Sequence, residues 1–207
     1  MAFAKSGSPS RRQRWFPQWA EEHRATREGV IVMDMSFMAK FLVQGRDAGR
    51  ALDQISANSV DGPSGLITYT QWLNDRGGIE ADVTVSRLDE TSFLVLSAAV
   101  DQRRDLAHLR RHLPADARVP ATDVTSGWSV INLQGPRSRE LLSRISPADL
   151  STDAFPYMHW REIEVGYAIV RATRATYMGE LGYELHVPTD MAQHVFDTVV
   201  AATDGLD

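Results

Sequence analysis

Residues 66–85 have the sequence LITYTQWLNDRGGIEADVTV, and this stretch predicts a β-hairpin. Its second half alternates apolar and polar residues, which is the period of a strand with one buried face. With a loop at residues 74–77, Tyr69 on the first strand lies directly opposite Asp82 on the second. Such a phenol–carboxylate pair is either a structural hydrogen bond on a solvated face or part of a functional site. The residues expected to face the core are Ile79, Ala81, Val83 and Val85.

The composition is that of an ordinary globular protein. The chain has 207 residues, of which 43% are hydrophobic and 24% charged, enough to bury a core as one domain or as two fused subdomains. No apolar run approaches the ~18 residues that a membrane-spanning helix needs. The N-terminus also lacks the apolar segment of a secretory signal. We therefore expect no membrane association and a cytoplasmic location.

The charge distribution argues against a nucleic-acid partner. The net charge is −5, and the basic residues near the N-terminus have no second basic stretch to extend them. Residues 1–14, rich in serine and arginine, are instead predicted to form a disordered leader.

The chain contains no cysteine, which excludes disulfides, thiolate metal sites and a cysteine nucleophile. His108 and His112 stand four residues apart on a predicted helix, a spacing that metal-binding pairs use. Two arginines lie between them and no carboxylate completes a known motif. A solvated helix face is therefore the favoured interpretation, and no metal is expected.

An internal repeat gives the architecture. FLVQG at residues 41–45 and INLQG at residues 131–135 lie 90 residues apart, and each precedes a helix with apolar residues at spacings of three and four. A hairpin and a second helix follow each copy. The later of these helices is expected to begin near Thr189 as its N-cap and to bury Val195, Phe196 and Val199. The prediction is an α+β fold of duplicated strand–helix–hairpin–helix units with mostly antiparallel sheets, with repeats at about 30–115 and 120–207.

Four segments, taken in order, resemble the folate-binding domain of the glycine-cleavage T-protein (aminomethyltransferase) superfamily. They are REGV with DMS at residues 27–36, YTxxLNxxGGIExDxTVxRL at 69–88, QGPRS at 134–138 and YMGELGYE at 177–184. The chain is most similar to the version found in dimethylglycine and sarcosine dehydrogenases and oxidases. The resemblance covers residues 15–207 and implies a single folate-binding, aminomethyltransferase-like domain made of the two repeats.

The resemblance implies a tetrahydrofolate site. Glu184 matches the glutamate that receives the pterin ring, whose two parallel N–H donors a carboxylate accepts in a fork. Tyr177 and Tyr69 match tyrosines that line the folate pocket, and Asp82 matches the catalytic aspartate.

Two details qualify this match. T-protein-type relatives carry Asp-Asp where this chain has Ala81-Asp82, so only the second carboxylate is kept. Aligning residues 78–80 with residues 182–184 places Glu80 at the position that Glu184 occupies in the second repeat.

The implied activity is transfer of a one-carbon unit from a small methylated amine or aminomethyl donor to tetrahydrofolate. A non-catalytic folate-binding module or truncated remnant, and a folate-dependent demethylase of another small methylated substrate, stay open as alternatives. The chain has no G-x-G-x-x-G fingerprint, so it is expected to bind no flavin itself and to work with a flavin-dehydrogenase domain or subunit. It ends at Asp207, before the family's C-terminal barrel, so we expect a truncated fragment that forms homo-oligomers.

Overall fold

The computed structural model describes residues 12–206, and the predicted leader lies almost entirely outside them. The helices are α1 (Phe16–Glu28), α2 (Ala48–Ile55), α3 (Gln102–His112), α4 (Ser138–Ile145) and α5 (Ala192–Ala201). The strands are β1 (Ile31–Asp34), β2 (Ala39–Gln44), β3 (Ile67–Leu73), β4 (Ile79–Arg87), β5 (Ser92–Ser97), β6 (Ala121–Asp123), β7 (Trp128–Gln134), β8 (Trp160–Val165), β9 (Ala168–Thr173) and β10 (Gly182–Pro188).

The strands form two five-stranded sheets in which every pair is antiparallel, as the α+β prediction requires. Sheet N has the order β3-β4-β5-β2-β6, and sheet C has the order β1-β7-β10-β9-β8. Each sheet has its own hydrophobic core, into which every second residue of its strands points. Sheet N buries Phe41 and Phe93 with residues of α2 and α3, and sheet C buries Leu133 and Tyr183 with residues of α4 and α5.

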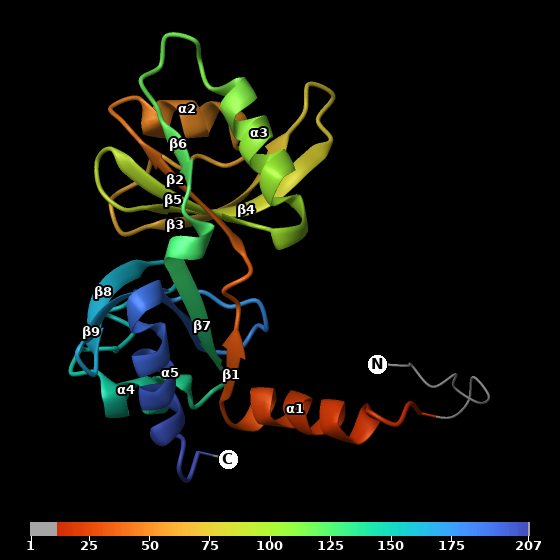
Figure 1. Ribbon diagram of the computed structural model, residues 1–207, viewed down its shortest axis with the longest axis vertical. Coiled ribbons are helices and arrows are strands. Elements are labelled where there is room, and N and C mark those ends of the chain that lie inside the picture. The colour runs from red at the N-terminus through yellow and green to blue at the C-terminus, as the bar shows by residue number, and fades with distance from the viewer. Residues whose placement is uncertain (1–11, 207) are drawn as a thin grey trace.

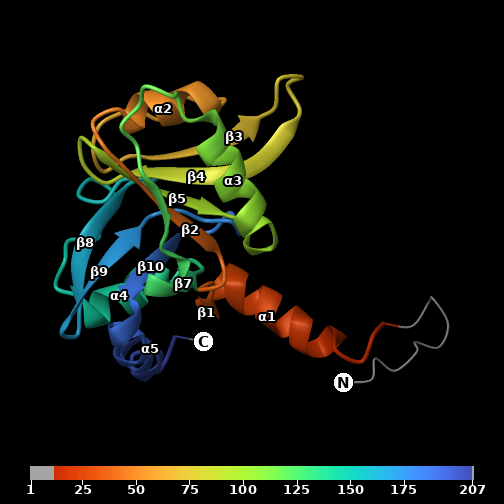
Figure 2. The ribbon, with the colours of Figure 1, turned by 45° about the horizontal axis from the view of Figure 1, so that its top comes forward.

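The helices lie on the outside of the molecule. Figure 1 shows α2 and α3 beyond sheet N at one end, and α4 and α5 beyond sheet C at the other. The opposite faces of the two sheets meet in the middle and enclose a cavity between them. Helix α1 projects away from this body in both ribbon views (Figures 1 and 2) and is closed by Gly29, whose N–H donates to the Ala25 carbonyl at 2.8 Å.

The duplication is confirmed element by element. Helix α4 begins and ends 90 residues after α2, and α5 begins 90 residues after α3. The strand register repeats with the same offset, because Leu42 pairs with Leu94 and Asn132 pairs with Glu184. Both copies therefore place equivalent residues on the faces where the sheets meet.

The repeat also corrects one sequence alignment. Strand β10 corresponds to β5, so the residue equivalent to Glu184 is Leu94 and not Glu80. Glu80 lies on β4, beside the hairpin loop, where its carboxylate accepts a hydrogen bond from Asn74 Nδ2 at 2.9 Å. The Gly-x-Glu pattern that residues 78–80 and 182–184 share is therefore a local similarity, because the two strands occupy different places in their sheets.

The two repeats exchange their first strands. Strand β1 belongs to the first repeat but pairs with β7 in sheet C, and its counterpart β6 pairs with β2 in sheet N (Figure 1). Each crossover is fixed in the same way just after the strand. The Met35 N–H donates to the Val130 carbonyl at 2.8 Å, and the Val124 N–H donates to the Lys40 carbonyl at 2.9 Å.

The predicted hairpin exists, but its register differs by two residues. Asn74 closes the loop by pairing with Gly78, which shifts the strand register by one residue. A bulge at Glu80 shifts the register by one more. Tyr69 therefore lies opposite Thr84, and Asp82 lies opposite Gln71. The bulge also interrupts the alternation, so Ile79 is 68% exposed instead of buried with Ala81, Val83 and Val85.

Two helix predictions need correction. His108 does not lie on a solvated face: it is buried, and its ring stacks against Trp72 at a centroid distance of 6.1 Å. The segment at Thr189 starts as a short 3-10 turn without a side-chain cap, because the Thr189 hydroxyl donates to the Ser126 carbonyl instead. In α5, Val195 and Val199 are buried as predicted, whereas Phe196 is 44% exposed.

Residues 12–206 contain no group of three or more His, Asp or Glu side chains placed to hold a metal ion. None of the helices described there is long and apolar enough to cross a bilayer.

Candidate functional site

The hairpin carboxylate is held by two neighbours on β3. Asp82 Oδ2 accepts a hydrogen bond from the Tyr69 hydroxyl at 2.8 Å, and Asp82 Oδ1 accepts one from Gln71 Nε2 at 3.0 Å. The first contact runs diagonally across the ladder, which the length of a tyrosine permits. The Asp82 carboxylate raises the pKa of Tyr69, so the phenol stays protonated and donates. Tyr69 is 52% exposed, so the pair is open to an incoming molecule.

Glu184 lies on β10, the central strand of sheet C, on the face turned away from α4 and α5. Its carboxylate accepts hydrogen bonds from Thr173 Oγ1 at 3.2 Å and from Asn132 Nδ2 at 3.4 Å, the two residues directly opposite on the flanking strands. Burial opposes ionisation, but His186, Thr173 and Asn132 outweigh it and hold the pKa of Glu184 below its ordinary value. Glu184 is therefore a carboxylate at neutral pH, with 22% of its side chain exposed.

Polar atoms beside Glu184 are buried without partners. Among the described residues, nothing forms a hydrogen bond with Asn132 Oδ1, with either ring nitrogen of His186 or with the side-chain amide of Gln134. His186 Nε2 lies 3.7 Å from Glu184 Oε2, which is too long for a hydrogen bond. Each such group costs about 1–3 kcal/mol if it stays unpaired. Such groups complete their hydrogen bonds with a polar ligand or with water.

Tyr177 lies in the loop between β9 and β10 and is 94% exposed. The loop is anchored to α1, because Arg27 Nη1 donates to the Met178 carbonyl at 2.9 Å and to Glu180 Oε1 at 2.7 Å. The phenol of Tyr177 lies close enough to Tyr69 to contribute, as the weakest of several influences, to the raised pKa of that residue.

The four predicted site residues thus form two groups. Tyr69 and Asp82 touch each other on sheet N with Tyr177 within electrostatic reach, and Glu184 occupies its own polar cluster on sheet C. In the part of the chain that the structure describes, no hydrogen bond or ion pair joins the two groups. The sequence analysis did not identify Gln71, Asn132 or Thr173. Asn132 occupies the position that Leu42 has in the first repeat, and this replacement of an apolar residue by a polar one can be seen by comparing the two repeats.

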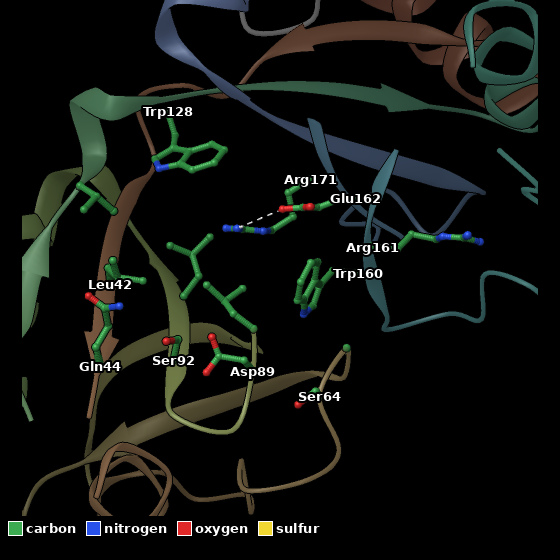
Figure 3. Close-up of a pocket in the computed structure, with 14 residues that line it drawn as sticks. Leu42, Gln44, Ser64, Asp89, Ser92, Trp128, Trp160, Arg161, Glu162 and Arg171 are labelled. Carbon is green, nitrogen blue, oxygen red and sulfur yellow. Dashed lines mark ion pairs between the residues drawn. The ribbon is translucent and has the colours of Figure 1, made fainter. Parts of the chain in front are cut away.

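A separate cavity of about 690 Å³ opens between the two sheets (Figure 3). Its walls include Leu42 and Leu94 from sheet N and Trp160 and Arg171 from sheet C, and none of the four predicted site residues lines it.

The duplicated α+β fold, with its two antiparallel sheets and exchanged first strands, is that of a T-protein-like domain. Comparison with known proteins identifies the family: residues 2–207 match the GCVT N-terminal domain, and the chain belongs to that family. The resemblance inferred from the four sequence segments is thereby confirmed.

The chain is similar to an oxidase and to aminomethyltransferases. It is 41% identical over 195 residues to a 4-methylaminobutanoate oxidase (formaldehyde-forming) of Paenarthrobacter nicotinovorans, covering 94% of this chain and 24% of the relative. It is 32% identical to an aminomethyltransferase of Chlorobium phaeovibrioides, covering 89% of this chain and 51% of the relative. The crystal structure of the glycine cleavage system aminomethyltransferase T from Bartonella henselae superposes with a TM-score of 0.75 at 25% identity, covering 90% of this chain and 52% of that chain. The chain thus spans between about a quarter and a half of these relatives.

Proposed function

We propose that this chain is the tetrahydrofolate-binding part of a protein that transfers a one-carbon unit from an aminomethyl or N-methyl donor to tetrahydrofolate. Bound tetrahydrofolate would supply the nucleophilic nitrogens that accept the one-carbon unit. The chain's own residues bind and orient this acceptor and stabilise charge next to it.

The observation that carries the proposal is the ionised, largely buried carboxylate of Glu184. It retains acceptor capacity beside its bonds to Thr173 and Asn132, and it faces away from the hydrophobic core. A pterin ring offers two parallel N–H donors, which a carboxylate accepts in a fork that fixes orientation as well as affinity. The unpaired atoms of Asn132, Gln134 and His186 suit the remaining donors and acceptors of such a heterocycle.

Asp82 supports the transfer step. A carboxylate near the reacting nitrogen can accept its proton and stabilise positive charge that develops on the one-carbon unit, and a general base contributes about 10²–10⁴-fold to a rate. Tyr69 and Gln71 fix both oxygens of Asp82, so the carboxylate needs little reorganisation. Tyr177 offers an exposed ring close to the pair for stacking on a planar ligand.

The name of the Paenarthrobacter nicotinovorans relative, 4-methylaminobutanoate oxidase (formaldehyde-forming), favours a methylated amino acid as the donor. That relative is an oxidase, which supports a flavin-dehydrogenase domain or subunit as the partner of this chain. The short share of each relative that the chain covers also supports the second candidate, a folate-binding module without turnover of its own.

Calorimetric titration with 5-formyltetrahydrofolate tests the proposal. We expect saturable binding to the wild-type chain and loss of binding in Glu184→Gln, which removes the charge and keeps the shape. Glu164→Gln is the matched control, because Glu164 lies on an exposed position of β8 and should not affect binding. Equal binding by wild type and Glu184→Gln would contradict the proposed pocket.

Turnover separates the first two candidates. With a flavin-dehydrogenase partner and a methylated amine donor present, Asp82→Asn should bind 5-formyltetrahydrofolate normally but lose about 10²–10⁴-fold of the transfer rate. Unchanged transfer in Asp82→Asn would remove Asp82 from the reaction. Binding without any transfer by the wild-type chain would favour the non-catalytic module.

A further inference from the structure

Arg171 is held between two tryptophans in the cavity between the sheets. Its guanidinium carbon lies 5.0 Å from the ring centroid of Trp128 and 5.0 Å from that of Trp160. Figure 3 shows the guanidinium extending into the cavity between the two indoles. Only 14% of the Arg171 side chain is exposed, so two aromatic faces replace most of its water.

This buried cation lacks a good acceptor. Arg171 Nε is buried, and no side chain or carbonyl of the described residues accepts a hydrogen bond from it. The nearby acid, Glu162, places its Oε1 atom 3.8 Å from Arg171 Nη2, beyond hydrogen-bonding distance, and its side chain is 60% exposed. Burial lowers the pKa of Arg171 and Glu162 partly opposes this, yet an arginine keeps its charge. The planar edge of the guanidinium is therefore available to a stronger acceptor.

The walls of the cavity are fixed before any ligand arrives. Trp160 Nε1 donates to the Arg87 carbonyl at 2.7 Å, and the Trp160 N–H donates to the Gly65 carbonyl at 2.8 Å. An isolated bridge between Leu66 and His159 joins sheet N to sheet C at the same place. Since both sheets contribute to these contacts, the cavity keeps its shape without help from a ligand.

The rest of the lining selects the kind of ligand. Leu42, Leu88 and Leu94 give the wall opposite Arg171 an apolar character. Arg161 points away from the cavity (Figure 3), because its Nη1 atom donates to the carbonyls of Asp149 and Ala154. Among the described lining residues, Arg171 is thus the cation that points inward. One guanidinium suits a single carboxylate better than a polyanion such as a nucleotide or inorganic phosphate, which the carboxylates of Glu162 and Asp89 would repel more strongly.

We propose that this cavity is a second ligand site, distinct from the folate site, for a small organic carboxylate with a hydrocarbon body. Its carboxylate accepts hydrogen bonds from the edge of Arg171 and displaces Glu162, and its hydrocarbon part packs against the leucines. A volume of about 690 Å³ suits a ligand of metabolite or drug size.

Benzoate is the probe, and benzamide is its neutral control of the same shape. The chain has five tryptophans, so incorporation of 5-fluorotryptophan gives five fluorine NMR signals, which single Trp→Phe variants assign. We expect benzoate to shift the signals of Trp128 and Trp160 saturably. The signals of Trp15, Trp19 and Trp72, which do not line the cavity, should stay in place.

Three variants show which group holds the probe. Arg171→Met keeps an unbranched stem and should weaken benzoate binding by at least about tenfold. Glu162→Gln removes the internal competitor and should tighten benzoate binding. Glu164→Gln, two residues further along β8, should bind benzoate like the wild type. If Arg171→Met fails to fold, the Glu162→Gln and benzamide comparisons still decide the matter.

Several results would overturn the proposal. These are the absence of shifts at Trp128 and Trp160 with benzoate, equal binding of benzamide, tighter binding of inorganic phosphate than of benzoate, or weaker benzoate binding in Glu162→Gln. Because Arg171 pairs with His186 across β9 and β10, titration with 5-formyltetrahydrofolate is repeated in the presence of saturating benzoate. Unchanged folate binding is expected for two distinct sites, and competition between the two ligands would overturn their separation.

Discussion

The two repeats share a backbone register but carry opposite chemistry on the faces where their sheets meet. The first repeat has Leu42, Leu94 and Leu96, and 90 residues further on the second has Asn132, Glu184 and His186. Burial does not separate the sets: Leu94 and Leu96 are 2% and 8% exposed, and Asn132 and His186 are 4% and 0% exposed. Since leucines serve the fold at these positions in one copy, the fold does not require the polar set in the other, and its unpaired atoms support the proposed binding role.

The largest effect on stability should come from making the first repeat resemble the second. Leu94→Asn removes a buried side chain and introduces an amide with no partner, and we expect a loss of about 2–4 kcal/mol in the free energy of unfolding. Urea denaturation measures it. Leu94→Met, which conserves volume, should cost less than about 1.5 kcal/mol. Equal stability of Leu94→Asn and wild type would show that this face tolerates polar residues. The difference between the two repeats would then no longer support a binding role for the polar residues.

The converse change tests stability and binding together. Glu184→Leu restores the residue of the first repeat but leaves the Asn132 and Thr173 donors without their acceptor, so it should lower the free energy of unfolding by about 1–3 kcal/mol. Binding of 5-formyltetrahydrofolate should weaken by about 10–150-fold, the equivalent of about 1.5–3 kcal/mol for hydrogen bonds to a charged group. A marked destabilisation with intact binding would instead make Glu184 a structural residue.

A smaller effect should appear in the dependence of stability on pH. The pKa of Glu184 is lower in the folded protein than its ordinary value of 4.5, so the folded state binds this proton less readily than the unfolded state. Its contribution to stability is present above pH 4.5 and disappears as the pH falls through the folded pKa. The difference in unfolding free energy between wild type and Glu184→Leu should therefore shift against the wild type on acidification. Parallel curves for the two proteins down to low pH would contradict this linkage.

The smallest effect should be at the hairpin. Tyr69→Phe removes an exposed hydrogen bond to Asp82, so it should change the free energy of unfolding by less than about 0.5 kcal/mol. A loss well above 1 kcal/mol would identify the pair as a structural contact, the other interpretation that the sequence left open. Thermal and urea denaturation of the two proteins side by side would decide it.

Much of the architecture could be predicted from the sequence, because the duplication shows the same order of strands and helices twice. The helices after Gln44 and Gln134 have equal lengths and equal offsets, so each supports the other. The hairpin register was not accessible, because it depends on the side chain of Asn74 closing a longer loop and on a bulge at Glu80. Neither feature changes the alternation strongly enough to be seen in the sequence.

The roles assigned to the candidate site residues come from the resemblance and stay predictions. Glu184 alternates with its neighbours like any residue on a strand, and its significance comes from Thr173 and Asn132, which lie close only after β9 and β7 pair with β10. Long-range pairing of this kind leaves no local signal. The homo-oligomer expected from the sequence stays a prediction, which light scattering across the micromolar range would test.

The exchange of β1 and β6 has a consequence for how the two halves of the chain fold. If the chain were cut in the connection between α3 and β6, each piece would keep four strands of one sheet and lend the fifth to the other. Neither piece could complete its own sheet, so the two should fold only together, as a pair of complementing fragments. The same geometry describes two identical subunits that trade their first strands about a two-fold axis. The present chain has the arrangement that fusion of such a homodimer would produce, except that its two halves differ: Leu42, Leu94 and Leu96 stand where the other half has Asn132, Glu184 and His186.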